Sequence, residues 1–156
     1  MSQTLNGSNS RSRLSAPPQP SAAMPPRILM AEDNLINQRV GKLILQRAGF
    51  SVDVAGDGVE TLEAHKKHPY DIVLMDCQMP HMDGFEASLE IRKLPLTQPA
   101  IIAVTANALV GERERCLNAG MDDYLSKPFQ AEQLVAIVVK WIGIRETLER
   151  SSAATA

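Results

Sequence analysis

Five polar residues stand at or just beyond the ends of short apolar runs, and their side chains could together carry out phosphoryl chemistry. Three are carboxylates, one is a hydroxyl and one is an amine: Glu32, Asp33, Asp76, Thr105 and Lys127. A carboxylate can act as a nucleophile and form an acyl phosphate. Three carboxylates in one cleft repel one another unless a cation lies between them. Because their ligand atoms are all oxygens, a hard ion is favoured, Mg²⁺ above all, with Mn²⁺ as the alternative.

Phosphoryl transfer needs in-line positioning of the reacting atoms and neutralisation of the charge on the phosphoryl oxygens. In this set the metal ion and Lys127 would neutralise charge, and Thr105 would donate a hydrogen bond. No histidine or cysteine is placed to compete as the nucleophile, and we expect Cys77, which directly follows Asp76, to point into the core. The residue types therefore fit a phosphoacceptor site.

The elements that must position these side chains follow from the alternation of short apolar runs with helical patterns. The expected strands are residues 27–31, 51–55, 71–75, 100–104 and 123–125. The expected helices are residues 35–47, 59–69, 85–93, 108–119 and a last one from Pro128 onward. This alternation predicts an α/β fold, a doubly wound parallel sheet with helices on both faces. All strands of a parallel sheet end on the same edge, where open sheets bind ligands, so the five polar residues should converge.

Composition changes sharply near residue 27. Residues 1–26 are rich in Ser, Pro, Asn and Gln and contain no acidic residue. Such a segment cannot bury enough apolar surface to offset its ordering entropy, so we expect a disordered linker or tail there. We expect the folded unit over residues 27–144 and a C-terminal tail over residues 145–156. A chain of 156 residues that is 44% hydrophobic can bury one core but hardly two.

Charge and cysteine content exclude several classes of protein. The net charge is −2 with 22% charged residues, which argues against a nucleic-acid binder. Cys77 and Cys116 are far apart in the sequence and have no metal-ligand spacing, so we expect reduced thiols of a cytoplasmic protein. The longest apolar stretch, residues 134–144, is interrupted by Lys140 and is too short to cross a bilayer, so we expect no membrane contact.

Four sequence motifs resemble those of response-regulator receiver domains, in the same order and at compatible spacings. They are Ala31-Glu-Asp-Asn34, Met75-Asp-Cys-Gln-Met-Pro80 with Met82-Asp-Gly84, Val104-Thr-Ala106, and Met121-Asp-Asp-Tyr-Leu-Ser-Lys-Pro128. The residues of these motifs are most similar to those in the receivers of hybrid sensor histidine kinases, and the match covers the whole folded unit. The resemblance implies a five-stranded, flavodoxin-like sheet of order 2-1-3-4-5.

The resemblance also implies roles for individual residues in a two-component phosphorelay. Asp76 would accept a phosphoryl group from phosphohistidine, and Lys127 would contact the phosphate. The metal ligands would be Glu32, Asp33, Asp76 and the backbone carbonyl of Gln78. Thr105 and Tyr124 would change rotamer on phosphorylation. The domain would not be an enzyme beyond its own phosphorylation and slow dephosphorylation, and its parent protein would be a hybrid histidine kinase or a free-standing regulator.

The implied partners are a histidine kinase or a histidine phosphotransfer domain, docking on a monomer in the cytoplasm or on the cytoplasmic part of a membrane-anchored kinase. We expect the docking surface to comprise Asn34, Ile36, Asn37, Val40, Pro128 and Phe129. On the first helix, Leu35, Leu43 and Ile44 would form the buried stripe and leave Ile36 and Val40 exposed. The alternative is that Ile36 and Val40 only widen that buried stripe.

Two other functions and several plainer interpretations stay open at this point. A phosphatase that forms an aspartyl phosphate would want a second acid two residues after the nucleophile, where this chain has Gln78. A flavin- or dinucleotide-binding domain would want a glycine- or hydroxyl-rich loop after the first strand, where this chain has Glu32-Asp33-Asn34. Glu32 and Asp33 could merely cap the following helix. His65 and His68 are expected at the surface.

Overall fold

The computed structural model describes residues 25–107 and 109–155, with side chains as far as Ser151. Strands and helices alternate along the chain without exception in these residues. The elements are β1 (Ile28–Ala31), α1 (Leu35–Arg47), β2 (Val52–Ala55), α2 (Gly58–Lys67), β3 (Ile72–Asp76), α3 (Gly84–Lys93), β4 (Ala100–Thr105), α4 (Glu112–Asn118), β5 (Asp123–Ser126) and α5 (Ala131–Thr155). The strands pair in parallel in the order β2-β1-β3-β4-β5, so the predicted fold is confirmed.

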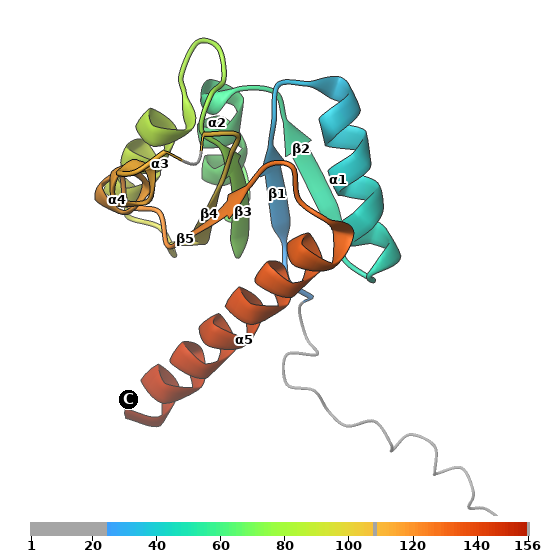
Figure 1. Ribbon diagram of the computed structural model, residues 1–156. Coiled ribbons are helices and arrows are strands. Elements are labelled where there is room, and N and C mark those ends of the chain that lie inside the picture. Colours follow the sequence, from blue (N-terminus) through green and yellow to red (C-terminus); the bar gives the residue numbers. More distant parts are fainter. Residues whose placement is uncertain (1–24, 108, 156) are drawn as a thin grey trace, which may run out of the picture.

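Helices cover both faces of this sheet, and each face has its own core. Helices α1 and α5 lie on one face, and α2, α3 and α4 lie on the other (Figure 1). Every residue of β1, β3 and β4 is buried, because these central strands are covered from both sides. Alternate residues of each strand therefore belong to the two separate hydrophobic clusters.

Helix α1 turns a different side to the sheet from the side that the sequence predicts. Leu35 and Leu43 are 66% and 48% exposed, and Ile44 is only partly buried, so the expected stripe is wrong. The buried residues of α1 are Gly41 and Leu45 instead.

Gly41 lies on the side of α1 that faces β1. A Cβ atom at Gly41 would meet the terminal atoms of the Met30 side chain, so the present position of that side chain uses the space that the glycine leaves. The side of α1 that carries Gly41 packs against the sheet, although another side of the helix carries more apolar residues. Helical periodicity alone could not show this, because it weighs apolar residues and gives a glycine little weight.

The start of α4 and the end of α5 also differ from the expected boundaries. Helix α4 begins at Glu112 rather than near residue 108, because Gly111 before it has a left-handed backbone (φ 94°). Helix α5 continues to Thr155, through residues expected to form a tail. Its extension packs back on the domain, since Arg145 donates to the carbonyl of Gln98 at 2.6 Å. Residues 1–24 of the expected linker lie outside the described residues. None of the described helices is both long and apolar enough to cross a bilayer.

Candidate functional site

The three carboxylates meet at the carboxyl edge of the sheet. Asp76 is the last residue of β3, and Glu32 and Asp33 follow β1, the strand that pairs with β3. One carboxylate oxygen from each of the three lies within 4.8 Å of the others. Glu32 and Asp76 are buried, whereas Asp33 is exposed to solvent. The predicted convergence of these residues is therefore correct.

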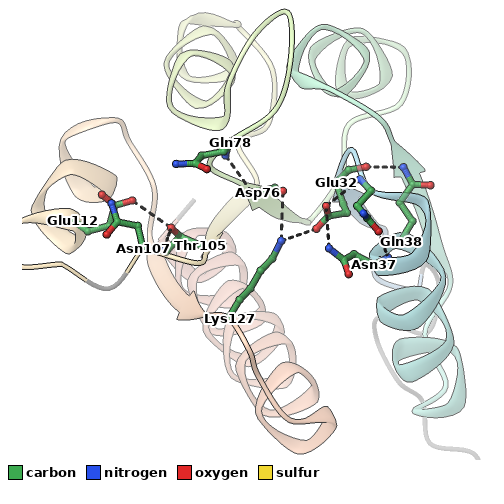
Figure 2. A network of polar contacts seen from close by, with 10 residues as sticks. Glu32, Asn37, Gln38, Asp76, Gln78, Thr105, Asn107, Glu112 and Lys127 are labelled. Atoms are coloured by element: carbon green, nitrogen blue, oxygen red, sulfur yellow. Dashed lines mark hydrogen bonds and ion pairs between the residues drawn. The ribbon is translucent and has the colours of Figure 1, made fainter.

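Lys127 reaches both buried carboxylates from the segment after β5. Its Nζ lies 2.9 Å from Oε1 of Glu32 and 3.5 Å from Oδ2 of Asp76 (Figure 2). Burial lowers the pKa of Lys127, but the hydrogen bond to Glu32 and the charge of Asp76 outweigh burial, so the pKa is raised overall. Lys127 is therefore a fixed positive charge beside Asp76.

The two buried carboxylates have opposite pKa shifts. Burial and the negative charge of Glu32 together raise the pKa of Asp76 to about 6, against the lowering effects of the bond from the Gln78 amide and of the charge on Lys127. Burial also raises the pKa of Glu32, but its bonds to Lys127 and to the Asn34 amide lower it by more. Asp76 is thus the carboxylate with the least compensated charge, the one that gains most from a cation or from modification.

Neither acid after β1 caps helix α1, so that plainer interpretation is wrong. The N-cap is Asn34, whose side chain accepts a hydrogen bond from the Asn37 amide at 2.9 Å. Glu32 points instead toward Lys127, and Gln38 donates to the backbone carbonyl of Glu32 at 2.6 Å. These bonds hold Glu32 in place at the edge of the sheet (Figure 2).

Backbone hydrogen bonds from Gln78 and Gly84 hold the loop after β3 close to Asp76. The amide of Gln78 donates to Oδ1 of Asp76 at 3.1 Å. Gly84 donates from its amide to the carbonyl of Cys77 at 3.1 Å, and a Cβ at Gly84 would collide with the backbone carbonyl of Asp76. The Asp83-Gly84 pair is therefore more than a turn, because Asp83 also forms a capping box with Glu86 at the start of α3.

The loop is also tied to the start of α2. His81, with a left-handed backbone (φ 69°), places Nδ1 2.8 Å from Oδ2 of Asp57. Gly58 donates to the carbonyl of Met82 at 3.0 Å. The bond from the Glu60 amide, and then the bond to His81, lower the pKa of Asp57. Sequence analysis missed this contact, because no motif connects the two segments.

This donor set fits a hard divalent cation. Asp33, one of the three carboxylates, lines a cleft of about 640 Å³ together with Gln78. Its nearest ligand atoms are carboxylate oxygens, which Mg²⁺ prefers, and an exposed Asp33 leaves room for bound water. Two buried acids with a single lysine between them also leave negative charge that a cation would offset.

Thr105 and Tyr124 lie in contact with the loop between β4 and α4 rather than with Asp76. The hydroxyl of Thr105 donates to Oε2 of Glu112 at 3.3 Å and accepts from the amide of Asn107 at 3.0 Å. The hydroxyl of Tyr124 donates to the carbonyl of Asn107 at 3.2 Å. The switch role of Thr105 and Tyr124 stays a prediction, and their partners Glu112 and Asn107 were not predicted from the sequence.

The two cysteines are neighbours in the fold, although they are far apart in the sequence. Their sulfur atoms and a carboxylate oxygen of Glu112 lie within 4.8 Å of one another. Burial raises the pKa of both thiols, so they stay protonated and unreactive. Cys77 points into the core as expected. His65 is fully buried, contrary to expectation, and its Nδ1 accepts from the Tyr70 amide at 3.1 Å.

Four of the six residues expected to dock a partner line an apolar depression that Lys127 also lines. Ile36 and Val40 are 70% and 50% exposed, which excludes the interpretation that they belong to the buried stripe. Asn37, Val40, Pro128 and Phe129 line a pocket of about 380 Å³ between α1 and the start of α5. Asn34, as the N-cap of α1, is also exposed.

The chain is similar to receiver domains of known proteins. A family model described as the response regulator receiver domain matches residues 28–139. The chain is 40% identical over 126 residues to hybrid signal transduction histidine kinase B of Dictyostelium discoideum, a match that covers 73% of this chain and 6% of that kinase. Across three Dictyostelium hybrid kinases, the matches span 6%, 11% and 7% of the relatives' lengths.

Two solved structures are also similar. One is the receiver domain of a sensor histidine kinase from Pseudomonas aeruginosa, with magnesium coordinated in its active-site cleft (TM-score 0.72, 44% identity, 77% of this chain and 99% of that chain). The other is a receiver domain from Saccharomyces cerevisiae bound to a histidine phosphotransfer protein (TM-score 0.70, 27% identity, 75% of this chain and 88% of that chain). With the matched residues spanning the sheet and all the strand ends that form the site, the chain belongs to the response regulator receiver domain family, a phosphorelay module of two-component signalling.

Proposed function

We propose that Asp76 is the phosphoacceptor, and that it receives its phosphoryl group from a phosphohistidine on a partner protein. The observation that carries this proposal is the pairing of a buried, strand-end carboxylate with Lys127 and two further acids at one edge of the sheet. The domain is then a phosphoacceptor that catalyses at most its own phosphorylation and slow dephosphorylation. A phosphatase or a flavin-binding domain is not favoured, given the family to which the chain belongs.

The transfer step uses one oxygen of Asp76 as the nucleophile. This oxygen attacks phosphorus in line with the phosphorus–nitrogen bond of phosphohistidine, forming a phosphorus–oxygen bond as the phosphorus–nitrogen bond breaks. The electron pair of the broken bond stays on the imidazole nitrogen, which takes up a proton. Lys127 offsets charge on the phosphoryl oxygens, and the Gln78 amide orients the carboxylate.

We propose that Glu32, Asp33, Asp76 and the backbone carbonyl of Gln78 hold Mg²⁺, with Mn²⁺ as a substitute. The ion would neutralise charge on the transferring phosphoryl oxygens. The oxygen-only donors support this assignment, as does the magnesium in the similar Pseudomonas receiver.

We propose that phosphorylation draws the hydroxyl of Thr105 toward the phosphoryl group and lets the ring of Tyr124 turn inward. The modification adds about −1.5 to −2 charge units, which attract a hydroxyl proton. In the unphosphorylated domain the hydroxyl of Tyr124 donates to the carbonyl of Asn107. The ring could turn into the space that Thr105 leaves when it moves. The change is a shift between two packings of the same core.

We propose that a histidine kinase or histidine phosphotransfer domain docks over Asn34, Ile36, Asn37, Val40, Pro128 and Phe129. The donor histidine has to reach Asp76, and this exposed apolar surface is beside it. The parent protein would be a hybrid kinase whose receiver is monomeric and cytoplasmic, with residues 1–26 as a linker and residues 27–144 as the receiver.

The test is labelling by acetyl phosphate in the presence of Mg²⁺. We expect the wild-type chain to incorporate phosphate, and Asp76→Asn to incorporate none, because the amide is not a nucleophile. Excess chelator should abolish labelling of the wild type. Glu114→Gln, which removes a carboxylate from an exposed position on α4, should label normally. Stable incorporation by Asp76→Asn would overturn the proposal.

A further inference from the structure

The hydroxyl proton of Thr105 already has a partner, and that partner is on the side of Thr105 away from Asp76. Figure 2 shows Glu112 and Asn107 on one side of Thr105 and Asp76 on the other. Thr105 donates to Glu112 and accepts from Asn107, and both Thr105 and Glu112 are buried. A hydroxyl has one proton to donate. The proton that bonds to Glu112 is therefore unavailable to a phosphoryl oxygen on Asp76.

Glu112 is an unusual residue at its position in α4. An acid in the first turn of a helix is favoured by the helix dipole and can stay in water. Glu112 is instead 7% exposed, and its carboxylate lies beside the thiols of Cys77 and Cys116. The side chain of Glu112 also lines the cleft that contains Asp33 and Arg115, and its contact with the Thr105 hydroxyl, at 3.3 Å, is a long hydrogen bond. The bond ties the first turn of α4 to the end of β4.

We propose that Glu112 is a positioning residue that restrains the switch. It holds the hydroxyl of Thr105 on the α4 side in the unphosphorylated domain, and it competes with the phosphoryl group for the same proton. When Thr105 moves, the buried carboxylate loses its hydroxyl partner, so the first turn of α4 has to shift toward water. Glu112 thereby couples the state of Asp76 to α4. This inference rests on the proposed movement of Thr105.

The test uses beryllofluoride with Mg²⁺ as the probe, titrated into the metal-loaded domain and followed by the NMR signals of the Tyr124 ring. Glu112→Gln provides a neutral and weaker acceptor, so the half-saturating beryllofluoride concentration should fall about three- to tenfold. Glu114→Gln makes the same charge change at an exposed position on the same helix, and should leave the concentration unchanged. An unchanged value for Glu112→Gln would overturn the inference.

A second comparison separates a restraint on Thr105 from a general effect on packing. In a Thr105→Ala background there is no hydroxyl to hold, so adding Glu112→Gln should no longer alter beryllofluoride binding. An equal gain in both backgrounds would overturn the inference. If Glu112→Gln does not fold, Glu112→Asp, with a carboxylate one methylene shorter, makes the same comparison. A wild-type domain that binds no beryllofluoride, or binds it without any change at Tyr124, would refute the proposed function instead.

Discussion

Asp76 ends β3 and Glu32 follows the neighbouring strand β1, and the two are buried to nearly the same degree. Lys127 nevertheless lies at unequal distances from them. The ammonium group is 2.9 Å from Glu32 and 3.5 Å from Asp76, so Glu32 takes the stronger bond. Asp76 is left with the cost of burial and with repulsion from Glu32, which raise its pKa to about 6. The carboxylate of Asp76 is thus ionised at neutral pH, at a cost to the fold that a cation would offset.

This cost predicts that Asp76→Asn stabilises the metal-free domain. A carboxylate with a raised folded-state pKa binds its proton more tightly when folded, so its ionisation destabilises the fold at pH values above about 6. In chelator at pH 7.5 we expect the free energy of unfolding in urea to rise by about 1 to 2 kcal/mol. The gain should shrink as the pH falls from about 6 toward the unfolded-state pKa, because the wild-type carboxyl is then protonated too.

Glu32→Gln is the matched comparison, with the opposite sign. The pKa of Glu32 is lowered overall, so its ionised form stabilises the fold at neutral pH, and that stabilisation is lost as the pH falls through the lowered pKa. Glu32→Gln should therefore destabilise the domain at pH 7.5. If both variants changed stability in the same direction, the unequal sharing of Lys127 would be refuted.

Helix α1 packs on the sheet through one side and exposes apolar residues on the other. Gly41 and Leu45 are buried, whereas Leu35, Ile36, Val40 and Leu43 are exposed. This exposed apolar surface is larger than the pair that the sequence predicts. Single exposed apolar residues are common, but a group of them beside a reactive carboxylate is typical of an interaction surface.

We predict that Val40→Glu slows phosphoryl transfer from a histidine phosphotransfer partner by about tenfold or more, because a buried charge at the interface is costly. Val40 is half exposed, so the substitution should leave the melting temperature nearly intact. Labelling by acetyl phosphate, which needs no docking, should be unchanged. The measurement is the rate of transfer from a phosphorylated partner.

Leu89→Glu is the control for this surface. Leu89 is 46% exposed on α3, which covers the other face of the sheet from α1 (Figure 1). The Leu89→Glu domain should accept the phosphoryl group from the partner at the wild-type rate. Equal slowing by the two substitutions, or normal transfer to a folded Val40→Glu domain, would show that the exposed side of α1 is not the docking surface. An unfolded Val40→Glu domain would return Val40 to the core.

Across the whole molecule, alternation of strands and helices was enough to predict the fold and the edge at which the site forms. Parallel strands all end on one edge, so Glu32, Asp76, Thr105 and Lys127 could be grouped from their positions after apolar runs. The order of the strands followed from the resemblance of the motifs to a family.

Contacts between elements could not be predicted in this way. The bond from Thr105 to Glu112 and the bond from His81 to Asp57 depend on how helices pack on the sheet, which periodicity does not describe. Burial of His65 was missed for the same reason, since its position near a helix end indicated the surface.

The C-terminal boundary shows how such a contact changes the extent of the folded unit. Composition after residue 144 is polar and indicated a tail, but α5 continues, and Arg145 bonds to the carbonyl of Gln98 and to Asp71. The side chain of Arg145 is only 15% exposed. At the other end, the Arg27 amide donates to Asp71 at 2.7 Å, so Asp71 joins both ends of the domain.

These contacts predict that the two chain ends respond differently to truncation. A chain ending at Ile144 should lose about 1 to 2 kcal/mol of unfolding free energy relative to a chain ending at Ser151, because Gln98 and Asp71 lose a charged donor. Arg145→Ala in the full chain should reproduce most of this loss. Removal of residues 1–26 keeps the nitrogen of Arg27 as a donor to Asp71 and should leave stability nearly unchanged. The measurement is urea unfolding of these four chains beside the unaltered full chain. A chain ending at Ile144 that is as stable as the one ending at Ser151 would return the boundary to residue 144, and a large loss on removing residues 1–26 would place the start of the domain within them.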